Sequence, residues 1–168
     1  MGDWNVFFAT CAASAATLAG LLFLATQLHL DVFTDPSNRW AALAQSTLTI
    51  LSSVLGLSLT FLIPRLPLQV KADAVIVIVV IVLFRTVRLW WPVVRLAEKG
   101  RWQRIEQSFW LLLVPILVYF YLLVGAILLL TGDQVDGLIT DAGSFLAMFA
   151  VSMRNSWRLV VTVAREKS

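Results

Sequence analysis

Long apolar stretches separated by short polar segments make up most of the chain. An α-helix rises about 1.5 Å per residue, so about 20 apolar residues cross the roughly 30 Å hydrocarbon core of a membrane. The pattern predicts helices over residues 4–30, 39–63, 72–91, 108–130 and 138–164. Turn residues separate the first three helices, at Asp35 and Pro36 and again at Pro64 and Pro67. We therefore expect an all-α integral membrane protein, a bundle of five transmembrane helices.

The third apolar run, residues 72–84, has two interpretations. As a helix it would extend about 20 Å, so a full span requires residues 85–91 as well. We favour one long helix that includes them, because a tilted span is the commoner arrangement. In the alternative the run forms a re-entrant or interfacial helix, which leaves four full spans. Residues 85–104 are expected to form a basic helical extension on the cytoplasmic side.

Composition places the chain outside the range of soluble domains. Of its 168 residues, 60% are hydrophobic and 14% are charged, whereas soluble domains average roughly 45–50% and about 25%. Five spans use most of this length, so we expect one transmembrane domain over residues 1–168 and no separate soluble domain. Cys11 is the only cysteine, which excludes an intrachain disulfide.

The positive charges lie beside the apolar runs. The formal net charge is +3, and this distribution favours contact with anionic membrane lipids over nucleic acid as a partner. The residues expected to contact lipid headgroups are Arg85, Arg88, Arg95 and Lys99.

The charges of the loops predict the orientation. Residues 85–104 and 154–167 are basic, whereas Asp133, Asp136 and Asp141 make the connection before the last helix acidic. Because basic loops remain in the cytoplasm, five spans place the N-terminus outside and the C-terminus in the cytoplasm, in a bacterial inner membrane. Four full spans would place both termini in the cytoplasm.

Small residues on the first helix predict a surface for helix packing. They form two rows at helical spacing, Ala9, Ala13 and Thr17 in one, and Ala12, Ala16 and Gly20 in the other. Small side chains let a neighbouring backbone approach closely within a membrane.

Two other helices carry polar faces. On the second helix the face consists of Gln45, Thr49, Ser52, Gly56 and Thr60, and on the fifth of Asp141, Ser144, Asn155 and Arg158. For the second helix we favour hydrogen-bonded packing against the first helix over the lining of a pore. The face of the fifth helix is too polar for lipid, so it should face protein, water or headgroups. A functional alternative is an anion site or the vestibule of a symmetric oligomer.

Catalytic chemistry is not indicated. His29 is the only histidine, so a metal site around it has no second histidine or cysteine ligand. Asp133, Asp136 and Gly137 resemble the opening of the metal-binding motif of membrane CDP-alcohol phosphotransferases, but the rest of that motif is missing. We find no pairing of nucleophile and base, and we predict no enzyme activity, cofactor or metal.

The start of the chain resembles a family of small bacterial membrane proteins, some of which are labelled modulators of the FtsH protease. The resemblance lies in Trp4 and Asn5, Phe7 and Phe8, the small-residue stretch 9–16, and the LAGLLF segment at 18–23. It continues more loosely through residues 85–104, the LLLTG segment at 128–132 and the SWRLV segment at 156–160. The resemblance implies a noncatalytic protein, with a membrane partner such as a quality-control protease.

These patterns predict a protein that acts through helix contacts, by self-assembly or by modulating a membrane partner. A chain of five helices buries little interior surface, so we expect a symmetric homo-oligomer in contact with membrane lipids. The alternative is a homo-oligomeric ion channel or pore lined by the second or the fifth helix.

Overall fold

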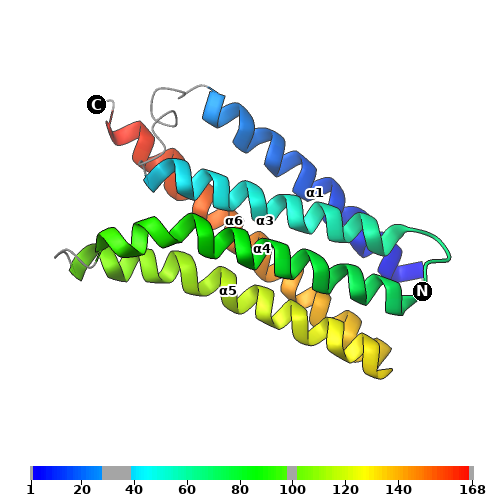
Figure 1. Cartoon of the computed structure of the whole chain (residues 1–168). Coiled ribbons are helices and arrows are strands. Elements are labelled where there is room, and N and C mark those ends of the chain that lie inside the picture. The colour runs from blue at the N-terminus through cyan, green and yellow to red at the C-terminus, as the bar shows by residue number, and fades with distance from the viewer. Residues whose placement is uncertain (1, 28–38, 98–101, 167–168) are drawn as a thin grey trace. The chain divides into compact units, whose positions relative to one another are not determined.

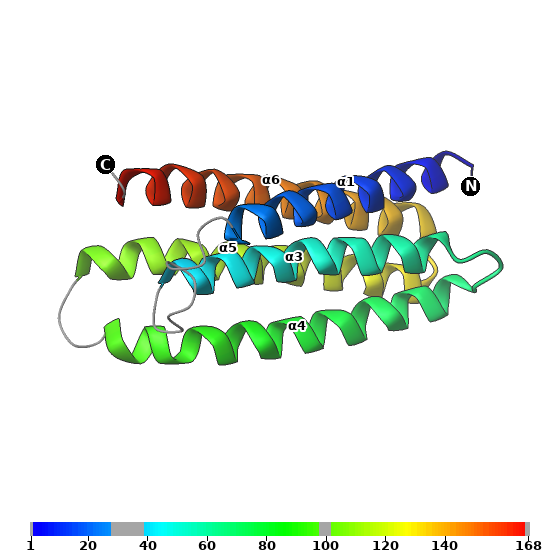
Figure 2. The same cartoon turned by 90° about the horizontal axis from the view of Figure 1, so that it is seen from above.

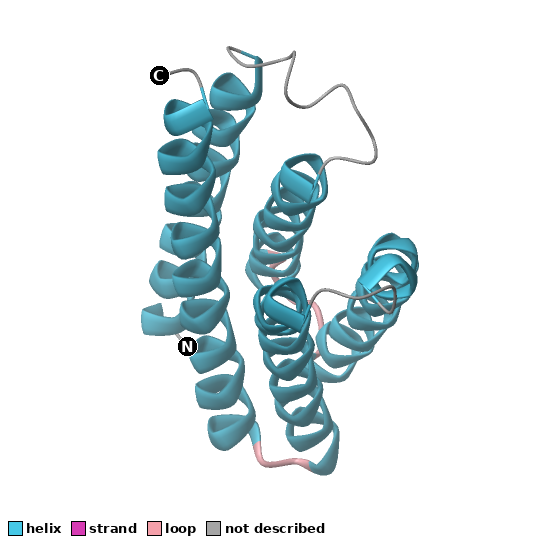
Figure 3. Ribbon diagram, turned by 90° about the vertical axis from the view of Figure 1, so that its left-hand side faces the viewer, coloured by secondary structure: helices cyan, strands magenta, loops and turns pink. Residues whose placement is uncertain are grey.

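The computed structural model describes the backbone of residues 2–27, 39–97 and 102–166, and side chains within 4–27, 41, 43–88 and 113–159. These residues form five helices and no strand (Figure 3), which confirms the all-α prediction. The helices are α1 (Gly2–Gln27), α3 (Arg39–Leu62), α4 (Leu68–Ala97), α5 (Trp102–Thr131) and α6 (Gln134–Glu166). His29, Lys99 and the turn at Asp35 and Pro36 lie outside the described residues.

Four of the helices are long and apolar enough to cross a membrane, as judged over the described residues. Their candidate spans are Trp4–Gln27, Leu43–Leu62, Leu113–Thr131 and Gln134–Leu159. Large apolar side chains lie exposed on these helices, including Phe23, Phe120 and Met153. Such surfaces suit lipid, whereas a soluble monomer rarely exposes apolar patches of this extent. The chain is therefore an integral membrane protein.

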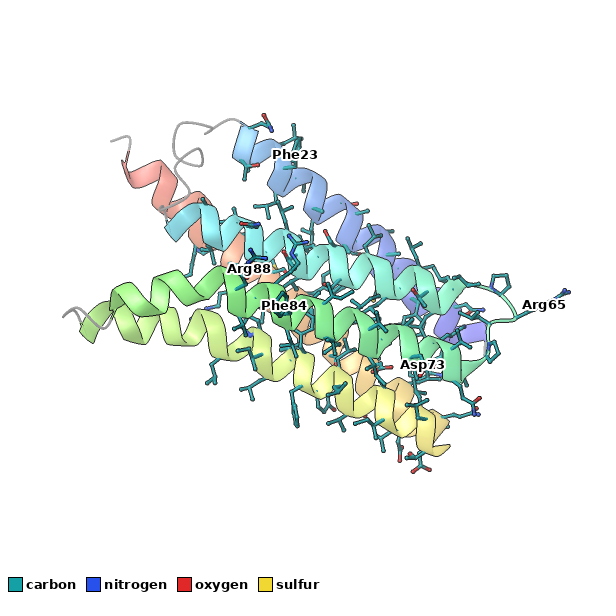
Figure 4. All side chains as sticks on the ribbon, in the orientation of Figure 1. Phe23, Arg65, Asp73, Phe84 and Arg88 are labelled. Carbon is teal, nitrogen blue, oxygen red and sulfur yellow. The ribbon has the colours of Figure 1, made fainter. Side chains whose placement is uncertain are left out.

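The fifth helix, α4, is not among the four candidate spans. It is one unbroken helix of 30 residues, so it extends about 45 Å, well beyond the predicted residues 72–91. A re-entrant segment must turn back inside the membrane, and α4 has no break at which it could do so. Its apolar stretch runs from just after Asp73 to Phe84, and Arg88 follows one turn later (Figure 4).

Contacts divide the chain into two compact units. The first contains Met1–Arg65 and Phe145–Ser168, and the second contains Leu66–Ser144. The predicted single domain thus has two parts, and α6 contributes its second half to the first unit and its first half to the second.

In the first unit α1 and α3 lie side by side, as Figures 1 and 2 show. The side chains of α1 that are buried are Phe8, Cys11, Ala12, Ala15 and Leu22. Phe8 stacks on Phe61 of α3 with ring centroids 4.4 Å apart. Both rings make edge-to-face contacts with Phe145 on α6. This aromatic cluster joins the three helices of the unit, because paired rings pack more favourably than their area alone suggests.

In the second unit α4 and α5 pack side by side (Figure 1). A tight turn then connects α5 to α6. Gly132 ends α5 with a φ of 102°, a conformation that favours glycine. The Asp133 amide donates to the Leu128 carbonyl at 3.1 Å, and the Gly137 amide donates to the Asp133 carbonyl at 2.9 Å. The last carbonyls of α5 and the first amides of α6 are thus partly satisfied within the turn.

Candidate functional site

The outward face of α1 carries only small side chains over three turns. Of the predicted packing residues, Ala12 is buried, whereas Ala9, Ala13, Ala16, Thr17 and Gly20 are exposed. The other exposed residues from position 9 to position 20 are Thr10 and Ser14. The Thr10 and Thr17 hydroxyls donate to carbonyls of the same helix, at 2.8 and 2.9 Å. This face therefore offers close backbone approach with few unsatisfied polar groups.

The predicted polar stripe on α3 is not the buried face of that helix. Gln45 and Ser52 are exposed, and Thr49, Gly56 and Thr60 are half-buried. The Thr49 and Thr60 hydroxyls donate to carbonyls of α3 itself, at 2.8 and 2.9 Å. The expected hydrogen-bonded packing of Gln45 and Ser52 against α1 is therefore wrong for this chain taken alone. The two helices do pack together, but through other faces.

A different set of polar residues on α3 is buried, and the sequence patterns did not single it out. It consists of Ser46, Thr47, Ser53 and Ser58. The Thr47 hydroxyl donates to the Leu43 carbonyl at 2.8 Å, so this residue brings no unpaired donor into the interior. Serine and threonine can satisfy themselves on their own helix, and hydropathy alone does not reveal which face they take.

The predicted polar face of α6 points inward. Asp141 and Ser144 are fully buried, Asn155 is 4% exposed, and Arg158 is half-buried. Asp141 was expected to add acidic charge to the loop before this helix. Instead it lies two turns inside α6, and the exposed acidic residues there are Asp133 and Asp136.

Gly125 of α5 receives the carboxyl group of Asp141. A Cβ atom at Gly125 would overlap the Asp141 carboxylate oxygen Oδ1, and it would lie 3.0 Å from Cγ and 3.2 Å from the Asp141 backbone nitrogen. Neither carboxylate oxygen has a hydrogen-bond partner among the described residues. The neighbouring hydroxyls are already engaged, because Ser144 donates to the Thr140 carbonyl at 2.9 Å and Thr140 to the Asp136 carbonyl at 2.7 Å.

One helical turn away the relation is reversed, because Gly137 of α6 receives a side chain of α5. A Cβ atom at Gly137 would lie 2.7 Å from Cγ of Leu129 and 3.0 Å from its backbone nitrogen. Each helix thus packs a side chain against a glycine of the other helix. Gly125 and Ala126 interrupt a run of large apolar residues in the sequence, and this pair of small residues is a signal of close helix approach.

No protein-family model matches the chain, and no curated protein or solved structure matches it either. The resemblance to modulators of the FtsH protease therefore stays a prediction.

Of the residues predicted to contact headgroups, two have described side chains. Arg85 and Arg88 are exposed on α4, one turn apart. The side chain of Arg95 and the whole of Lys99 lie outside the described residues. The described part of the basic extension can therefore reach a lipid or water surface.

Proposed function

We propose that this chain is a noncatalytic membrane protein that acts through helix contacts, with further copies of itself or with a membrane partner such as a quality-control protease. The observation that carries the proposal is the exposed small-residue face of α1, from Ala9 to Gly20. Within the first unit, none of the described residues covers this face. Between membrane helices, where lipid supplies no hydrophobic drive, close packing of small residues is a main source of association.

Cysteine crosslinking tests this proposal directly. Ala13→Cys in a Cys11→Ser background should give a disulfide-linked dimer in membranes if copies of the chain meet at this face. Ile81→Cys is the matched control, because Ile81 is also exposed but lies on the apolar face of α4. A photoreactive residue at position 13 should capture the partner if that partner is another protein. Equal crosslinking at positions 13 and 81, or no product with either reagent, would contradict the proposal.

Bulk on the same face provides a second test. Ala13→Leu should lower the crosslinking of an Ala9→Cys reporter, because a leucine side chain holds two backbones apart. Val6→Leu adds bulk where a large exposed side chain already stands and should leave the yield unchanged.

A homo-oligomeric channel is the second candidate, and the exposure of Gln45 and Ser52 on α3 favours it. Polar groups that face lipid are costly, so an oligomer that turns them toward a wet path would relieve that cost. The buried state of Asp141 and Ser144 favours α3 over α6 as the lining helix.

Conductance in liposomes distinguishes this candidate. Purified protein should conduct ions, and Gln45→Leu should change the conductance or its selectivity. Gln27→Leu, an exposed glutamine on α1, is the control and should have no effect. Absence of current from the reconstituted wild type at either polarity would exclude the channel.

We also infer that α4 crosses the membrane, which makes five spans. All of its exposed residues between Asp73 and Arg85 are apolar, namely Val77, Val80, Ile81 and Phe84. A helix that lies in the interface would present a polar face to water instead. With the basic residues 85–104 in the cytoplasm, the C-terminus is also cytoplasmic, in a bacterial inner membrane.

A further inference from the structure

We propose that Asp141 is a proton-binding site inside the membrane, formed where α6 packs against Gly125 of α5. The proposal goes beyond the helix contacts discussed above, because it concerns a titratable group within one copy of the chain. It can therefore hold or fail independently of self-assembly and of any partner.

The position of Asp141 is the first argument. The residue lies about 10 Å along α6 from Gln134, inside the candidate span Gln134–Leu159. Its side chain has no exposed surface. An ionisable residue at such a position is expensive to keep charged, and in membrane proteins it commonly marks a proton or ion site.

The surroundings of the carboxyl group are the second argument. A buried carboxylate needs hydrogen-bond donors or a positive partner, and neither of its oxygens has a donor among the described residues. The hydroxyls of Thr140 and Ser144, on the same helix, donate to backbone carbonyls instead. The α5 residue that faces the carboxyl group is Gly125, which offers backbone atoms and no side chain.

Among the residues whose side chains are described, no charged group lies at hydrogen-bond distance from the Asp141 carboxyl group. The part of α5 whose side chains are described, Leu113–Thr131, has no charged residue, and its titratable side chains are Tyr119 and Tyr121. On α6 itself Asp136 and Arg154 are exposed, and the half-buried Arg158 lies about 25 Å farther along the helix. The described charged residues of α4, the other helix of this unit, are Lys71, Asp73, Arg85 and Arg88.

The identity of the ligand follows from the small number of available oxygens. Hard metal cations take about six or more oxygen ligands. Here one carboxyl group faces a glycine, and the nearby hydroxyls are engaged with their own helix. A proton needs only one carboxyl oxygen, and the bound form is a neutral acid that the apolar surroundings tolerate.

Infrared spectroscopy of protein labelled with carboxyl-¹³C aspartate tests the site. At about pH 6 exposed aspartates are ionised, so a protonated-aspartate carbonyl band in the wild type would come from a buried residue. We expect the band in the wild type and in Asp136→Asn, and its loss in Asp141→Asn. Absence of the band in the wild type, or its persistence in Asp141→Asn, would overturn the proposal. Loss of the band when sodium chloride replaces choline chloride at constant pH would also overturn it, since the ligand would then be a metal cation.

A second measurement does not depend on the folding of Asp141→Asn. A membrane-permeant carbodiimide reacts with protonated carboxyl groups and can reach a buried one when the helices open transiently. Peptide mapping of the wild type after prolonged labelling should therefore locate the adduct at Asp141. The exposed Asp133 and Asp136 are internal controls and should remain unlabelled. Labelling of those two residues with none at Asp141 would refute proton binding at this position.

Discussion

Single residues decide how closely α5 and α6 approach each other. Gly125 and Gly137 each stand at a close contact between the two helices, and each receives a side chain from the opposite helix. The backbone nitrogen of the opposing residue is also near in both places, so the contact brings main chain against main chain. Side chains at these points would have to separate the helices, whereas glycine lets dispersion contacts form along the whole turn.

Gly125→Ala should therefore destabilise the protein. The added methyl group would overlap the Asp141 carboxyl and crowd its backbone nitrogen, and overpacking of this kind costs about 1–3 kcal/mol. Alanine recovers up to about 1 kcal/mol through its higher helix propensity, so the net effect is a loss. Thermal unfolding in detergent, followed by helical circular dichroism, measures it.

Gly56→Ala is the matched control for this prediction, because a Cβ atom at that position on α3 has nothing within 4 Å. It should leave the midpoint of unfolding unchanged or raise it slightly. If Gly125→Ala proved as stable as Gly56→Ala, the close approach of α5 to Asp141 would be wrong.

Which face of a helix is buried was harder to predict than the helix itself. The rows from Ala9 to Gly20 were recognised as surfaces for close packing, but α1 packs on its own neighbour through the face that carries Phe8 and Ala15. Small residues mark close approach without saying whether the neighbour belongs to the same chain. For the same reason the predicted packing of Gln45 and Ser52 against α1 was wrong. A polar stripe shows which residues share a face of the helix, but not what that face contacts.

At the scale of elements, local signals fixed some boundaries and not others. The second predicted helix, residues 39–63, matches α3 (Arg39–Leu62) closely, because Pro64 and Pro67 cannot continue a helix. The fourth was expected to begin near 108, yet α5 begins at Trp102. Hydropathy indicates which segment lies in the membrane and not where the helix begins or ends. It therefore does not reveal a polar first turn that extends the helix beyond the membrane span. For the same reason α6 begins at Gln134 rather than at 138.

At the scale of the whole molecule, the number of spans decides which side of the membrane each turn occupies. Arg65 lies exposed in the turn between α3 and α4 (Figure 4). If α4 crosses the membrane, Arg65→Cys in a Cys11→Ser background should react from outside the cell with an impermeant maleimide. The positive-inside bias gives this orientation, since the basic residues 85–104 then lie in the cytoplasm.

Asp133→Cys supplies the reference for that labelling experiment, because four and five spans both place the α5–α6 turn outside. Labelling of position 133 without position 65 would mean that α4 does not cross, and the protein would then have four full spans with both termini in the cytoplasm.

The shortness of the α5–α6 turn has a consequence for biogenesis. Only Gly132 and Asp133 separate the two helices, so neither helix can cross the bilayer while the other remains in water. The pair must enter as one helical hairpin, and the charged groups that its turn carries through the hydrocarbon are the two exposed carboxylates of Asp133 and Asp136. Insertion of this half of the chain should therefore need little mechanical work from a translocation motor.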